Sequence, residues 1–181
     1  MSTAETTIIA PVGTWNLDPV HSIVGFEVGY MVGTYKGRFH DVTASLGATE
    51  DGATLEGSAV VASVDVQNPD LSAHLQSPDF FDAERFPELR FRAEDVSLDG
   101  GRITADGEIT IKGVAKSVTV TGTVSPPISD PWGMQRLGIT LTATVDRTEF
   151  GLNWNNPLPT GGLALASDVT IVAELQFVQA A

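Results

Sequence analysis

The sequence predicts an all-β fold, an eight-stranded antiparallel barrel with a short helical excursion between its third and fourth strands. Alternation of apolar and polar residues runs through most of the 181 residues, as in strands with one buried face. Stretches with the 3.6-residue period of an amphipathic helix are nearly absent, so no helical layer is available to cover an apolar sheet face. We therefore expect the sheet to close on itself, with a two-sheet sandwich as the alternative.

The clearest alternation lies between Arg102 and Lys112, where apolar or small residues share one face and polar residues the other. Glycines between such runs predict hairpins between neighbouring strands. The strand runs, in order, are 15–17 continued by 24–30, then 35–46, 55–66, 89–93, 103–111, 118–124, 139–145 and 169–177.

The strand pattern stops between residues 66 and 89. Asn68 followed by Pro69, and Ser77 followed by Pro78, are each typical of a helix start, so two short helical pieces are predicted. The excursion is either a functional lid or a structural plug over one barrel end.

Two adjacent aromatic residues, Phe80 and Phe81, fall on the second of these pieces. Neighbouring positions of a helix are about 100° apart. We therefore expect only one of the two rings to point into the barrel.

Composition excludes several classes of protein. The chain has no cysteine, which excludes disulfides, thiolate nucleophiles and cysteine-ligated zinc. The formal net charge of −13 disfavours nucleic acid as a partner and repels anionic membrane surfaces. No window approaches the ~18 apolar residues of a membrane span, so membrane insertion is not expected.

The first residues suggest how the chain is organised. Residues 1–13 contain no lysine or arginine and lack the apolar run of a secretory signal, so we interpret them as a flexible N-terminal arm. Residues 14–181 then form a single β-barrel domain. We expect a cytoplasmic protein, with an exported mature form as the alternative.

Polar residues give little sign of catalysis. Asp18, His21 and Ser22 could suggest a hydrolase, but so short a spacing is more typical of a turn whose side chains bond the backbone. The chain has three histidines, His21, His40 and His74, and none shows the paired spacing of a zinc site. We predict that the protein is not an enzyme and requires neither a metal ion nor a cofactor.

Small residues on the predicted inner face leave two interpretations open. They either leave room for a ligand inside the barrel or ease the coiling of the strands. Because this face carries almost no charge, an occupant would be apolar along most of its length. The residues are Gly57, Ala59, Ala93, Ala105, Gly107, Gly122, Ala143 and Ala173.

Two loops carry tryptophans, Trp132 and Trp154. Each is either part of a binding site or a ring folded onto the barrel rim as ordinary core.

Several motifs together resemble the YceI-like family. The opening segment, residues 14–26 (TWNLDPVHSIVGF), resembles that family's W-x-[IL]-D-x-x-H-S-x-[IV]-x-F, and residues 74–91 (HLQSPDFFDAERFPELRF) resemble its H-L-x-S-x-D-F-F-D…[YF]-P-x-[IL]-x-F. The resemblance extends over residues 14–178 and is completed by residues 37–39, 107–116, Trp132-Gly133 with Arg136, and residues 147–152.

The resemblance implies a lipocalin-like barrel that binds, stores or transports a long-chain isoprenoid, such as a polyprenyl or quinone-type lipid, in its interior. It also suggests a homodimer. The chain departs from the family at residues 71–73, where Leu-Ser-Ala replaces a charged pair often found there.

We therefore predict an isoprenoid-binding protein. The alternatives are an enzyme acting on a lipophilic substrate, with His21 or His74 as acid or base, and a scavenger of other lipophilic molecules. We expect Arg147 to form a salt bridge within the protein. His74 and Asp79 are predicted at the mouth, and the predicted apolar lining comprises Phe26, Val28, Phe39, Phe80, Phe81, Phe91, Ile109, Ile111, Ile139, Leu141 and Trp154.

Overall fold

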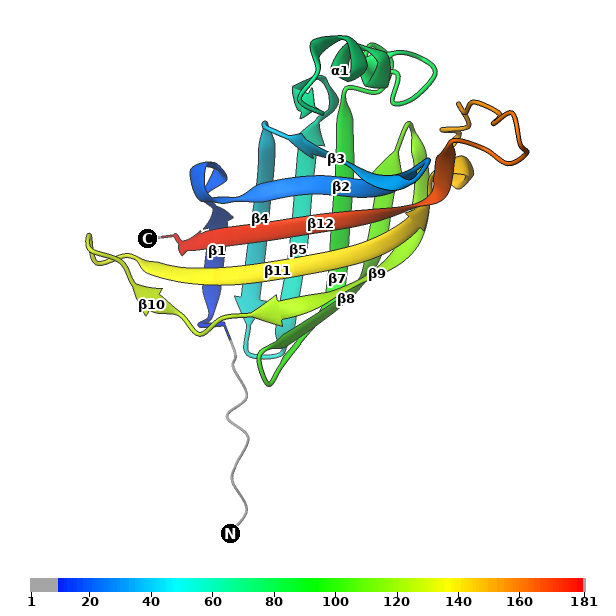
Figure 1. Ribbon diagram of the computed structural model, residues 1–181. Coiled ribbons are helices and arrows are strands. Elements are labelled where there is room, and N and C mark those ends of the chain that lie inside the picture. Colours follow the sequence, from blue (N-terminus) through cyan, green and yellow to red (C-terminus); the bar gives the residue numbers. More distant parts are fainter. Residues whose placement is uncertain (1–9, 181) are drawn as a thin grey trace.

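A computed structural model, which describes residues 10–180, shows a closed antiparallel barrel of eight strands (Figure 1). The ring runs β11-β9-β8-β7-β5-β4-β1-β12 and closes where β12 pairs with β11. The predicted barrel class and strand number are therefore confirmed. The ring strands are β1 (Gly13–Leu17), β4 (Val42–Thr49), β5 (Gly52–Val60), β7 (Glu88–Asp99), β8 (Arg102–Ile111), β9 (Val114–Val124), β11 (Gln135–Asp146) and β12 (Leu165–Gln179).

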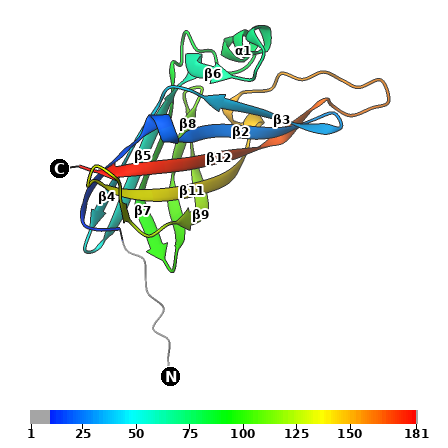
Figure 2. The same ribbon diagram turned by 60° about the vertical axis from the view of Figure 1, so that its left-hand side comes forward.

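The long strand β12 has two partners along one edge. Its C-terminal end pairs with β1, from Leu17↔Phe177 to Trp15↔Gln179, whereas its N-terminal part pairs with β2 (Ile23–Tyr30). Beyond β2 the sheet continues into β3 (Gly33–Phe39) and the two-residue β6 (Val64–Asp65). A further short strand, β10 (Ile128–Ser129), pairs with β11. The sheet therefore closes at the end occupied by β1 and extends past the ring at the end occupied by β2 and β3 (Figure 2).

The predicted strand boundaries are wrong in three places. Residues 35–46 were expected as one strand, but the chain turns at His40 and Asp41 and divides into β3 and β4. Two short 3-10 helices, η1 (Pro19–His21) and η2 (Val61–Ser63), interrupt the first and third predicted strands. The physical reason for the first error is a change of phase, because the inward-facing residues Phe39 and Val42 are three positions apart rather than two.

The excursion contains one helix. Asn68 caps α1 (Pro69–Gln76), its Oδ1 accepting hydrogen bonds from the backbone N–H groups of Asp70 and Leu71 at 3.0 and 3.1 Å. The helix predicted after Ser77 is wrong, because this segment forms successive turns. The carbonyl of Ser77 accepts from both Phe80 and Asp82, and Asp82 has a φ of 53°, which helices do not allow. In Figure 1 the excursion lies over one end of the barrel.

The closed end of the barrel is packed with large side chains. Trp15 and Phe177 are fully buried, and Leu46, Ile103 and Ile139 are within 1% of full burial. The predicted arm over residues 1–13 reaches this end: residues 1–9 lie outside the described residues, but Ala10 is 1% exposed and Pro11 accepts a hydrogen bond from Trp15 Nε1 at 3.0 Å. This end is therefore filled by protein.

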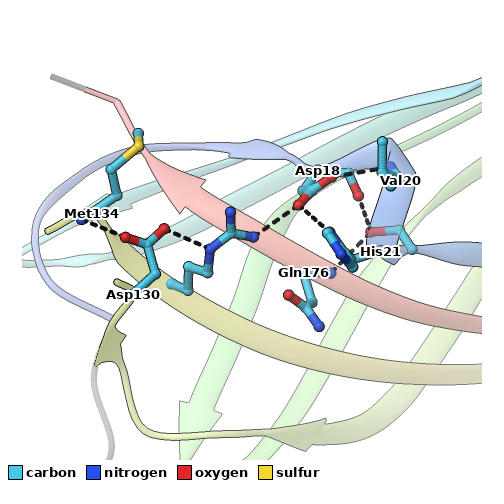
Figure 3. Close-up of polar contacts among 8 residues, drawn as sticks. Asp18, Val20, His21, Asp130, Met134 and Gln176 are labelled. Atoms are coloured by element: carbon cyan, nitrogen blue, oxygen red, sulfur yellow. Dashed lines mark hydrogen bonds and ion pairs between the residues drawn. The ribbon is translucent and has the colours of Figure 1, made fainter. Parts of the chain in front are cut away.

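A charged cluster ties the corner between β1 and β2 to β11 (Figure 3). Arg136 donates from Nη1 to Asp18 Oδ2 at 2.8 Å and from Nε to Asp130 Oδ2 at 2.9 Å. His21 Nδ1 also lies 2.7 Å from Asp18 Oδ2. The hydrogen bond from Arg136, followed by that of His21, lowers the pKa of Asp18 from 3.8 to about 2.

The same corner decides between the two interpretations of Asp18, His21 and Ser22. Asp18 accepts from the backbone N–H of Val20, and Ser22 Oγ donates to the Asp18 carbonyl at 2.6 Å and accepts from Gln176 N–H. The serine hydroxyl is thus held by backbone groups, which is the turn arrangement and not that of a triad.

No helix within residues 10–180 is long and apolar enough to cross a membrane.

Replacing Asp18 with asparagine should lower the free energy of unfolding by about 1–2 kcal/mol at pH 7, because an amide N–H group replaces the acceptor that faces Arg136. The loss is modest because both side chains keep some contact with solvent, at 14% and 20% exposure. The lowered pKa means that the carboxylate stabilises the fold fully above about pH 4 and loses this effect as the pH falls to about 2.

Urea unfolding of both proteins between pH 2 and 7 checks this. The difference between wild type and Asp18→Asn should disappear near pH 2. Glu88→Gln, which removes an exposed ion pair with Arg90, is the control and should change stability by less than ~0.5 kcal/mol. Equal effects of the two substitutions at pH 7 would contradict the prediction.

Candidate functional site

The barrel encloses an apolar cavity of about 350 Å3 at the end opposite the packed core, within the size range of small-molecule sites. Its walls come from β2 and β3 on one side, β4, β5 and β7 on another, and β11 and β12 on a third. The excursion and the segment after β11 supply the remaining wall. Residues from nearly every element of the fold therefore meet around one space.

Ten of the thirteen predicted site residues line this cavity. Their shared feature is an inward-facing side chain on β2, β3, β7, β8 or β11, or a place on the excursion or the 150–165 loop. They are Phe26, Val28, Phe39, His74, Phe80, Phe81, Phe91, Ile111, Leu141 and Trp154. Their contact with a ligand stays a prediction.

Three predicted site residues lie elsewhere. Ile139 belongs to the packed end, with 1% exposure, and Ile109 packs beside the cluster formed by Phe80, Ile111, Phe150 and Leu152. Asp79 is exposed, with its Oδ2 3.0 Å from His74 Nε2. Sequence alternation gave the correct face for both isoleucines but not their height along the barrel axis.

The rings of Phe80 and Phe81 both line the cavity, so the expectation of a single inward ring is wrong. Because turns replace the predicted helix here, each ring reaches a different wall. Phe80 packs against Trp154 at a centroid distance of 5.4 Å, and Phe81 packs edge-on against Phe39 at 5.8 Å. The excursion thus contributes to the cavity wall through both side chains.

His74 is the histidine placed at the cavity. It lies edge-on to Phe80 and to Trp154, at 5.0 Å from each, and its Nε2 is 3.0 Å from Asp79 Oδ2. His21 is 60% exposed in the corner cluster, away from the cavity lining. Within residues 10–180 no three His, Asp or Glu side chains gather as a metal site would require.

Arg147 is buried under the cavity wall. We expected it to form a salt bridge, but no carboxylate of the described residues pairs with it, and its guanidinium instead donates to backbone carbonyls. Nε donates to Ala166 at 2.7 Å, Nη1 donates to Leu152 and Trp154, and Nη2 donates to Leu165 at 3.4 Å. Arg147 therefore holds the loop after β11 in place.

The two tryptophan loops differ. Trp154 is partly buried and lines the cavity, whereas Trp132 is 79% exposed on the loop before β11. Trp154 packs against the core cluster of Phe80, Ile111, Phe150 and Leu152 while lining the cavity, whereas Trp132 is not part of a core.

Some of the small residues on the inner face leave room in the cavity, and others allow neighbouring strands to approach closely. Gly57, Ala59, Ala143 and Ala173 line the cavity and leave it room. By contrast, a Cβ on Gly107 would lie 2.5 Å from the carbonyl of Arg92, so that glycine permits close approach of strands.

Sequence reasoning missed several lining residues, including Tyr35, Leu75, Leu165 and Ile171. The alternation in 35–39 and 169–177 was a signal for two of them. Tyr35 Oη is buried without a hydrogen-bond partner among the described residues, and burial raises the pKa of this phenol.

Comparison with known proteins identifies the family. The model of the YceI-like domain matches residues 15–177. The chain belongs to the YceI-like family. UPF0312 proteins of Staphylococcus aureus are 30–31% identical to it over 168 residues, which is 90% of this chain and 96% of those proteins.

Solved structures of YceI-like and related proteins share the fold. BcnA of Burkholderia cenocepacia superposes with a TM-score of 0.77 at 22% identity, covering 88% of this chain and 98% of its own. The YCEI protein of Campylobacter jejuni gives 0.70 at 22% identity over 83% and 88%. A polyisoprenoid binding domain from Saccharophagus degradans gives 0.69 at 13% identity over 92% and 98%.

The segments that resemble YceI-like motifs occupy distinct places in this fold. The opening segment forms the corner with Asp18, His21 and Ser22. The segment with His74, Phe80 and Phe81 forms the cavity wall.

Replacing Arg147 with lysine should lower the free energy of unfolding by about 2–4 kcal/mol, because one ammonium group cannot serve carbonyls on both sides of the loop and some are left without a donor. Urea unfolding measures the loss. Hydrogen exchange should also accelerate in residues 152–166.

Arg92→Lys is the matched control, since Arg92 is 70% exposed and pairs with Glu94 at the surface. A stability change in Arg147→Lys as small as in this control would show that the carbonyl contacts are not what holds the loop.

Proposed function

We propose that this YceI-like protein binds a long-chain isoprenoid, of the polyprenyl or quinone type, in the barrel cavity and stores or transports it without chemical change. The observation that carries the proposal is the apolar character of a cavity walled by residues from nearly every element of the fold. The Saccharophagus domain, described as polyisoprenoid-binding, supports it as a relative in fold. The proposal includes no metal ion and no further cofactor.

The few polar groups at the cavity favour an uncharged ligand body. Among residues 10–180 the charged side chains of the lining belong to Glu56, Arg90 and Arg147, and the first two are exposed on the outer surface. Arg147 is occupied by carbonyls. An anionic group placed deep in the cavity would therefore lose its hydration without gaining a free cation.

A polar head group fits best beside His74. The ring lies at the cavity wall with only part of its surface buried, and its Nε2 faces Asp79. We place the head group of the ligand here and the isoprenoid tail toward the packed end.

Native mass spectrometry of the purified protein, followed by lipid extraction, tests the proposal directly. A long-chain isoprenoid in stoichiometric amount supports it. A different lipophilic molecule in that amount would support the scavenger alternative.

Tryptophan fluorescence gives an independent test. Of the three tryptophans, Trp154 lines the cavity, Trp15 is buried at the packed end and Trp132 is exposed. A long-chain quinone should quench the emission saturably, and most of that quenching should be lost in Trp154→Phe. Equal quenching in wild type and Trp154→Phe would place the quinone elsewhere.

Phe81→Ala should weaken binding of a long-chain quinone about tenfold to seventyfold. The lost contact of about 60–100 Å2 corresponds to roughly 1.5–2.5 kcal/mol at ~25 cal/mol per Å2. Phe80→Ala should in addition lower stability by about 3–5 kcal/mol, because Phe80 is 7% exposed and packs with Ile111, Phe150 and Leu152.

Affinity and melting temperature are measured on each variant. Phe86→Ala is the control, because Phe86 belongs to the same excursion but not to the cavity lining. Early melting with wild-type affinity in both Phe80→Ala and Phe81→Ala would show that the excursion is only structural.

The enzyme alternative narrows to His74, since His21 does not reach the cavity. His74→Asn separates the two functions. Unchanged recovery of intact ligand from wild type and variant supports a binding protein, whereas a turnover that only the variant loses would establish an enzyme.

A further inference from the structure

Several stretches of this strongly acidic chain contain no charged residue, and two of them contain adjoining loops. These two are residues 28–35, the β2–β3 hairpin, and residues 150–167, which include the loop before β12; together we call them the uncharged rim. The segments adjoin each other, because Tyr30 pairs with Leu165 and Met31 N–H donates to the Ala164 carbonyl at 2.8 Å. Figures 1 and 2 both show the hairpin and the loop on the same side of the barrel.

The uncharged rim presents large apolar side chains to the outside. Val32 is fully exposed, and Leu163 and Met31 are 61% and 58% exposed. Exposed apolar side chains that gather on adjoining loops are typical of an interaction site.

The same rim borders the cavity. Tyr30, Tyr35, Trp154 and Leu165 belong to it and also line the cavity. In the described chain, Tyr30 and Leu71 are the large apolar residues that both line the cavity and are more than a third exposed. The cavity therefore reaches the surface beside the uncharged rim.

We propose that the uncharged rim docks on the surface of a bilayer of neutral lipids, so that a lipid passes between bilayer and cavity without crossing water. The exposed apolar side chains enter the interfacial region, where tyrosine and tryptophan also lie favourably. The purpose of docking rests on the proposed function, but docking itself does not require a bound ligand.

The net charge of the protein favours a neutral bilayer as the surface on which the rim docks. With a net charge of −13 the protein is repelled by anionic lipids, so the uncharged rim is matched to a zwitterionic surface. A second group of exposed apolar side chains, at the packed end, has charged neighbours and lies away from the cavity lining. Ile128 and Trp132 stand there around Asp130 and Arg136, and neither lines the cavity.

The test is flotation of the protein with phosphatidylcholine vesicles, comparing wild type with Val32→Asp and Leu163→Asp. Each variant should reduce the vesicle-bound fraction about tenfold, because it replaces buried apolar contact with a charge. Ile128→Asp is the matched control, with the same change of charge at the packed end, and should bind as wild type does.

Vesicle charge gives a second readout. Adding anionic lipid should weaken binding, and salt should restore it by screening the repulsion. Wild-type protein that does not float with phosphatidylcholine, or variants that float as well as wild type, would overturn the proposal. Loss of self-association in Val32→Asp with unchanged vesicle binding would overturn it in favour of an interface with a second copy.

Binding of a long-chain quinone in solution, read by tryptophan fluorescence, separates docking from the proposed function. Val32→Asp and Leu163→Asp should retain that binding, since neither residue lines the cavity. Failure of wild type to bind quinone, with normal flotation, would refute the proposed ligand and leave the docking inference standing.

Discussion

The pairing of β12 controls the form of this barrel. Along one edge it pairs with β11 from Asp168 to Val178, while along the other it pairs first with β2 and then with β1. Where β1 is the partner, the ring is complete and large side chains such as Trp15 and Phe177 fill it. Where β2 is the partner, β3 follows and pairs with the short β6, so the wall widens around the cavity. One strand with two partners therefore yields a solid end and a hollow end.

The sequence predicted the barrel because period-2 alternation identifies a face that must be covered, whatever the exact strand ends. It predicted the corner at residues 40–41 poorly, although Phe39 and Val42 carry the signal of a phase change. It could not predict the contact between Asp18 and Arg136, which are 118 residues apart and meet only through the barrel's closure. Local patterns thus determine strand character, whereas pairings between distant segments depend on register.

The same difference between local pattern and distant pairing explains which site residues were predicted correctly. Ile139 and Leu141 face inward from one strand, two positions apart, and both pack in the core of the packed end, yet only Leu141 also lines the cavity. Alternation along β11 is identical at the two residues, so depth within the barrel comes from the neighbouring strands and their stagger. The helix predicted for Phe80 and Phe81 failed for a related reason: Ser77 and Asp82 complete local turns that a capping pattern does not distinguish from a helix start.

The loop at the hollow end must be held in a fixed shape without charged side chains of its own. A loop that borders an apolar cavity without charged side chains has no ion pairs to fix its shape, and residues 150–167 are such a loop. Arg147 supplies the fixed points from beneath, through carbonyls at both ends of that loop. Because these bonds use the backbone, the side chains above them are left free to be apolar. Buried Arg147 and the uncharged rim are therefore linked. Because Arg147 makes the polar contacts beneath the loop, the outer surface of the loop can be apolar and compatible with lipid.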